Sequence, residues 1–77
     1  MTIEKMRELR RAKPFQPFLI RLHDGEKVKV REPFNMALSQ TGTYVVVFDP
    51  QGAYHHIDLS NISEITLQKK SGRAGKR

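Results

Sequence analysis

The chain has 77 residues, a length that allows one domain and lies near the lower limit at which a single hydrophobic core holds a protein together. It contains no cysteine, which excludes disulfides and a thiolate zinc site and removes the usual signature of a small secreted domain. No apolar run is long enough to cross a membrane, and the first residues lack the apolar stretch of a signal peptide, so we expect a cytoplasmic protein.

The formal net charge is +6, but most of it lies in a short C-terminal segment. Residues 69–77 carry five basic and no acidic side chains, whereas residues 1–68 carry nine basic and eight acidic ones. Because the segment 69–77 is dominated by Lys, Arg, Gly and Ser, it has little to bury, and we expect a disordered basic tail. The predicted domain spans residues 1–68 and is close to neutral.

The first predicted element is a short helix. Thr2 is a suitable N-cap, although Lys5 stands where a complete capping box would have Glu or Gln. Pro14 ends the helix near residues 12–13, because the residue before a proline is pushed out of the α region. One apolar stripe follows the helical period and is formed by Ile3, Met6 and Leu9.

After a proline-containing connector, the period changes to two, which predicts a hairpin of strands 18–23 and 27–31. A two-residue turn at Asp24-Gly25 would place lysines on the core face. We therefore prefer a three-residue turn over 24–26, with Gly25 or its neighbour in the left-handed conformation forming a bulge. This register pairs Ile20 with Val30 and Leu22 with Val28.

The remaining strand signals are short. Residues 32–35 should form a bend, and 43–48, which is β-branched and aromatic without clean alternation, should be a central strand covered on both faces. The other segments with strand character are 36–38, 53–59 and 65–67. One helix followed by about five short strands predicts a mainly β fold. We expect a closed or nearly closed five-stranded barrel, which removes exposed edges, with the helix covering one open end or face of it.

The sequence resembles the Sm-like family, which includes the LSm and Hfq-like proteins. The resemblance rests on Leu9-Arg10-Arg11 closing a helix, on the strand and turn over 20–25, and on Tyr54-His55-His56. It implies an SH3-like, Sm-like barrel, a homo-oligomeric ring built by strand pairing, and RNA held at the ring. The chain is also similar to small uncharacterised bacterial proteins with a Pro-Phe-x-Pro-Phe segment, here residues 14–18.

The candidate RNA-binding residues are basic or aromatic. On the predicted helix, the rotation of about 100° per residue gathers three arginines in one surface sector, which suits phosphates, although a merely solvated helix face is the alternative. Tyr54 and His56 share one strand face and could stack on bases, or simply form a polar outer face. The complete candidate set is Arg7, Arg10, Arg11, Lys13, Tyr54, His56, Lys69 and Lys70.

No enzyme activity, metal or cofactor is expected. His55 and His56 are adjacent, so in a regular strand they point to opposite faces and cannot chelate one ion. His55 should be partly buried, and Phe15 and Phe18 should be core rather than a stacking platform. Two functions stay open: a non-enzymatic Sm-like RNA-binding module, or an SH3-like adaptor that binds a protein partner through its grooves or an open strand edge.

Overall fold

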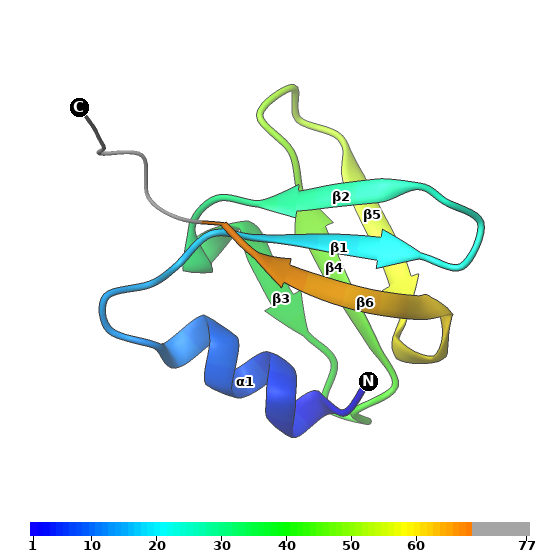
Figure 1. The fold of residues 1–77 in the computed structure, drawn as a ribbon, viewed down its shortest axis with the longest axis horizontal. Coiled ribbons are helices and arrows are strands. Elements are labelled where there is room, and N and C mark those ends of the chain that lie inside the picture. The colour runs from blue at the N-terminus through cyan, green and yellow to red at the C-terminus, as the bar shows by residue number, and fades with distance from the viewer. Residues whose placement is uncertain (69–77) are drawn as a thin grey trace.

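The structure is a computed structural model that describes residues 1–68. The chain has one α-helix and two three-stranded sheets. In Figure 1 the helix lies below the sheets, whose strands cross each other at an angle. The mainly β prediction is confirmed. In chain order the elements are α1 (Ile3–Arg11), β1 (Phe18–Leu22), β2 (Lys27–Val30), η1 (Pro33–Asn35), β3 (Met36–Leu38), β4 (Tyr44–Phe48), β5 (Tyr54–Asp58), η2 (Leu59–Asn61) and β6 (Ile62–Leu67).

Helix α1 begins and ends where the sequence predicts. The Thr2 hydroxyl accepts a hydrogen bond from the Lys5 backbone N–H at 3.2 Å, and the chain leaves the helix at Ala12 in an extended conformation. Ile3 and Met6 are buried and Leu9 packs against the core from a half-buried position, so the predicted apolar stripe is the face that docks the helix.

The register of the first hairpin differs from the prediction by two residues. Ile20 pairs with Val28, not Val30, and Leu22 donates its N–H to the carbonyl of Glu26 at 2.8 Å. The three-residue turn is therefore 23–25, closed by Gly25, whose φ of 93° confirms the left-handed glycine. A shift of two residues leaves every side chain on its expected face, because side chains alternate with a period of two.

The predicted five-stranded closed barrel is wrong. The structure has six strands in two separate three-stranded sheets, with strand orders β2-β1-β6 and β3-β4-β5. The bend expected at 32–35 contains the 3₁₀ turn η1, which carries the chain from β2 in one sheet to β3 in the other. The turn η2 carries it back from β5 to β6, which begins at Ile62 rather than Ile65.

A single hydrophobic core lies between the two sheets and beneath α1. Phe18 is fully buried at its centre, and the Phe15 ring lies 6.0 Å away in a half-buried position. Strand β4 was expected to be covered on both faces, but only Val45 and Val47 are buried while Phe48 is exposed, so its other face is open. The buried apolar residues are Ile3, Met6, Phe18, Ile20, Leu22, Val28, Val30, Met36, Val45, Val47, Ile57, Leu59 and Ile62.

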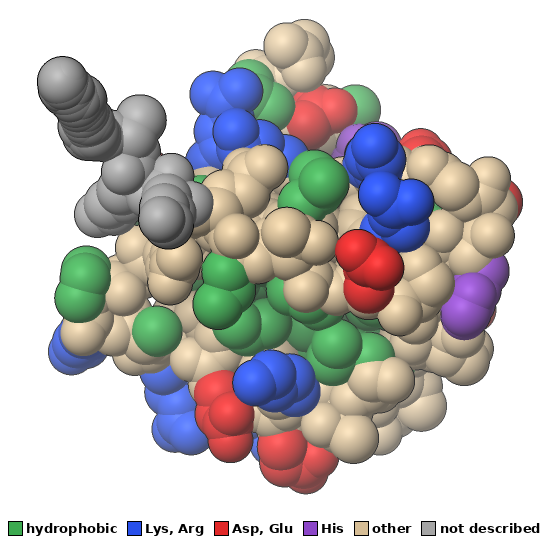
Figure 2. Space-filling model, in the orientation of Figure 1, with side chains coloured by type: hydrophobic (Ala, Val, Ile, Leu, Met, Phe, Trp, Pro, Cys, Tyr) green, Lys and Arg blue, Asp and Glu red, His purple; other side chains and the backbone are tan. Residues whose placement is uncertain are grey.

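Figure 2 shows the side of the molecule that carries α1 and the β2-β1-β6 sheet. Acidic and basic side chains are interspersed over it, and hydrophobic side chains are visible between α1 and β6. Within residues 1–68, no helix is long and apolar enough to cross a membrane. The predicted disordered tail, residues 69–77, lies outside the described residues.

Candidate functional site

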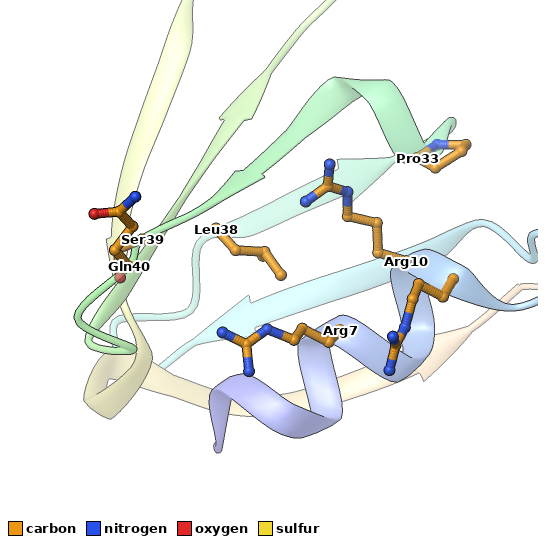
Figure 3. A pocket seen from close by; sticks show the side chains of 7 residues that line it. Arg7, Arg10, Pro33, Leu38, Ser39 and Gln40 are labelled. Atoms are coloured by element: carbon orange, nitrogen blue, oxygen red, sulfur yellow. The ribbon is translucent and has the colours of Figure 1, made fainter.

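A pocket lined by basic side chains lies between α1 and the end of β3. Its volume is about 440 Å³, which falls in the range of small-molecule binding sites. In Figure 3, Arg7 and Arg10 extend from α1 toward β3, with the Leu38 side chain between them. We call this feature the arginine pocket; it is lined by Arg7, Arg10, Arg11, Pro33, Leu38, Ser39 and Gln40.

The sequence builds the arginine pocket from both of its walls. On the helix side, burial of Ile3 and Met6 fixes the rotation of α1, so that the arginine sector faces β3. On the strand side, the buried Ser39 hydroxyl accepts the backbone N–H groups of Thr43 and Tyr44, each at 3.1 Å. These bonds hold the segment after β3 against the start of β4.

The arginine pocket has no acidic wall. No Asp or Glu lines it, and none of its three guanidinium groups has a carboxylate within 4.0 Å among residues 1–68. Among residues 1–68, an ion pair is found away from the arginine pocket, between His55 Nε2 and Asp49 Oδ2 at 3.5 Å. Glu4 and Glu8 on the same helix offset part of this charge, but three guanidinium groups without an ion-pair partner in a concave site still favour an anionic ligand. Guanidinium groups suit phosphate because they bind it in a bidentate manner.

Of the three remaining predicted basic residues, the structure describes one. Lys13 is exposed beyond the end of α1 and does not line the arginine pocket. Lys69 and Lys70 lie outside the described residues. The helical arginines are therefore the part of the predicted basic set that the structure brings together.

Tyr54 and His56 occupy a second surface, the outer face of the β3-β4-β5 sheet. Both side chains are exposed, while His55 is half-buried as predicted. The His56 ring stacks on Tyr44 at 4.3 Å, and the Phe48 and Tyr54 rings lie 6.4 Å apart. We call these four side chains, Tyr44, Phe48, Tyr54 and His56, the aromatic face.

The aromatic face is made by cross-strand neighbours. Phe48 on β4 is directly opposite Tyr54 on β5, and the pairing of Val46 with His56 places Tyr44 diagonally next to that histidine. Sequence reasoning missed Tyr44 and Phe48 because it expected β4 to be covered on both faces. Residues 44–48 are all apolar or aromatic, so their sequence does not distinguish the two faces of the strand. The open face is recognised only from the structure, in which Val45 and Val47 are buried and their neighbours are more exposed.

The arginine pocket and the aromatic face have different charges and different positions. Strand β4 separates β3, beside the arginine pocket, from β5, which carries Tyr54 and His56. Strands β3, β4 and β5 contain no lysine or arginine, and Asp58 is exposed on β5. The predicted RNA-binding residues are thus divided between a basic pocket and a nearly neutral aromatic surface.

The sequence also missed the non-basic wall of the arginine pocket. Its residues form no recognisable sequence motif, and only the docking of α1 beside β3 brings them together with the arginines. They are Pro33, Leu38, Ser39 and Gln40. Within residues 1–68, no three His, Cys, Asp or Glu side chains gather closely enough to hold a metal ion.

Comparison with known proteins gives one informative likeness. No protein-family model and no curated protein matches the sequence. An X-ray structure solved as a target of the Northeast Structural Genomics Consortium is similar, with a TM-score of 0.56 and 14% sequence identity, over 71% of this chain and 95% of that chain. At this identity the likeness concerns the fold alone, so function has to be argued from the site.

Proposed function

We propose that this chain is a non-enzymatic cytoplasmic module that binds RNA, with phosphate groups held in the arginine pocket. The observation that carries the proposal is the pocket itself: three guanidinium groups line it together, without an acidic neighbour in its wall. The resemblance to the Sm-like family on Leu9-Arg10-Arg11 implies the same ligand, but the five-stranded barrel that it also implies is not the observed fold. The resemblance also implies a homo-oligomeric ring; this prediction and the twofold dimer inferred below exclude each other.

The arginine pocket would act mainly through the backbone of the RNA. Arginine contacts to phosphate release condensed counterions, so they give affinity without sequence information and depend strongly on salt. Leu38 and Pro33 add an apolar wall that can accept the sugar or base next to a bound phosphate. We therefore expect weak sequence preference from this site.

Tyr54 and His56 would add contacts to unstacked bases. Their rings are exposed on a sheet surface, and an aromatic ring there can stack on any base. Because strands β3–β5 have no lysine or arginine, this surface by itself supplies little attraction for phosphate. In the proposal, the arginine pocket provides the main affinity and the aromatic face extends the contact.

The test compares two variants that lose the same charge at different places. One replaces Arg7, Arg10 and Arg11 with Gln, and the matched control replaces Arg21, Lys27 and Lys29, which are exposed on β1 and β2. Affinity for a short single-stranded RNA is measured by fluorescence anisotropy at low salt. The proposal expects a large loss of affinity only for the first variant; equal losses would show that net charge, not the arginine pocket, binds RNA.

The protein-binding adaptor is the second candidate, and the aromatic face is the observation that favours it. Phe48 and Tyr54 are 45% and 68% exposed and are cross-strand neighbours on a surface without basic residues. Exposed apolar groups of this kind are typical of protein contacts. If the adaptor function is correct, the purified chain lacking residues 69–77 retains no RNA; RNA that remains bound contradicts it.

A further inference from the structure

Each of the two sheets ends in two edge strands, and three of the four edges carry a feature that discourages pairing with another strand. The edge of β3 is covered by α1, which packs against it. Lys27 and Lys29 place charges along β2. On β6 the register shifts, with Ser63 as the extra residue and the Glu64 charge beside it. Coverage, charge and bulges are the ways in which proteins protect sheet edges.

The fourth edge, that of β5, has none of these features. Its pairing with β4 runs from Tyr54 to Asp58 without a register shift. The strand contains no Lys, Arg or Pro, and Asp58, its single acidic side chain, stands at its end. No other strand among residues 1–68 pairs with its free side. An edge with these properties is a template for another strand.

The hydrogen-bond pattern shows which groups of β5 are available. The Asp49 N–H donates to the Ala53 carbonyl at 2.9 Å, and the Leu59 N–H donates to the Thr43 carbonyl at 3.0 Å. These bonds frame an antiparallel ladder in which alternate residues of β5 bond to β4. The backbone N–H and C=O groups of the other residues point away from the sheet; these residues are Tyr54, His56 and Asp58.

We propose that β5 pairs antiparallel with β5 of a second copy of this chain, about a twofold axis at His56. In this register His56 faces His56 of the other copy, and Tyr54 faces Asp58. All the outward backbone groups of both strands then find partners, and no acidic side chain lies opposite its own copy. The free edge is therefore complementary to itself, as a twofold interface requires.

A second copy is favoured as the occupant for two further reasons. The chain is small and has no cysteine, and association is one of the ways in which such domains gain stability. Pairing at β5 also joins the two aromatic faces into one continuous surface, because Tyr54 and His56 lie next to the axis. The charged edges of β2 and β6 stay outside the interface.

This inference goes beyond RNA binding and does not depend on it. Because α1 and the arginine pocket lie at the β3 edge, pairing at β5 places the two pockets of a dimer at opposite ends of the joined sheet. Two separated phosphate sites on one particle would increase the affinity for RNA that is long enough to reach both.

The test is site-specific cross-linking of the full chain. The natural sequence has no cysteine, so His56→Cys introduces one thiol, and any disulfide that forms joins two copies. Directly opposed residues of a hydrogen-bonded antiparallel pair have Cα atoms about 5.5 Å apart, which lies within the range that disulfides bridge. Ser63→Cys on the β6 edge and Gln51→Cys in the exposed 49–53 turn are the matched controls.

The expected result is a dimer mass for the unmodified protein by light scattering and a disulfide-linked dimer for His56→Cys alone under mild oxidation. His56→Lys, which adds a charge to the edge, should be a folded monomer with an unchanged far-UV circular dichroism spectrum. A monomeric unmodified protein, a particle of more than two copies, or a dimer in which Cys forms no bridge at position 56 would each overturn the proposal.

Discussion

Truncation of Met6 tests whether the docking of α1 is as tight as the structure shows. Met6 is completely buried between the helix and the sheets, and a Met→Ala change in a core removes about 2–5 kcal/mol. The described domain of 68 residues has a free energy of unfolding of about 3–10 kcal/mol at the usual stability per residue. Met6→Ala should therefore remove about a fifth or more of the stability.

The assay is urea unfolding followed by far-UV circular dichroism, with Glu8→Ala as the control because that side chain is exposed on the same helix. We expect a loss of about 3 kcal/mol for Met6→Ala and a change within about 0.5 kcal/mol for the control. A loss below about 1 kcal/mol for Met6→Ala would refute the docking of α1. It would also remove the physical basis of the arginine pocket, since that docking aims the arginines at β3.

Two other changes test local features by the same urea assay. Ser39→Ala should cost about 1–3 kcal/mol, because it leaves the N–H groups of Thr43 and Tyr44 without their buried acceptor; an unchanged midpoint would mean that water replaces the hydroxyl without loss. Gly25→Ala should cost about 1–2 kcal/mol, because φ is 93° there, in the left-handed region. Gly52→Ala should cost about the same, because φ is 92° and an added Cβ would meet no atom within 4 Å at either position. If neither variant changed the free energy of unfolding, the left-handed turns would be contradicted.

Helix α1 could be predicted closely because its determinants are local. The N-cap, the apolar stripe and Pro14 all act within a few residues of the backbone that they shape, and the helix has the predicted limits. The arginine sector follows from the same helical geometry. What the sequence could not provide is the strand wall of the arginine pocket, which depends on a contact between α1 and β3.

The hairpin shows where local reasoning loses precision. Alternation correctly predicts which side chains of β1 and β2 face the core, but it is unchanged by a shift of two residues. The observed turn is selected by backbone bonds around Gly25 and by the Asp24 carboxylate, which accepts the Glu26 N–H at 2.8 Å. These interactions select the three-residue turn over 23–25 instead of the predicted three-residue turn over 24–26.

The arrangement of the sheets could not be derived from strand signals alone. The bend at Pro33 was identified, but its effect, the separation of β2 and β3 into different sheets, depends on which strands pair over long range. The same is true of β4, whose apolar sequence suggested burial on both faces. Among residues 1–68 no further layer covers its outer side, and Phe48 is exposed there.

The salt dependence of RNA binding by the full chain tests the central claim most directly. For single strands, the logarithm of the affinity falls with the logarithm of the salt concentration by about 0.7 for each phosphate that is neutralised. Replacement of Arg7, Arg10 and Arg11 with Gln should therefore lower this slope by about 2, while replacement of Arg21, Lys27 and Lys29 leaves it unchanged. Equal slopes for the unmodified protein and the arginine-pocket variant would contradict the account.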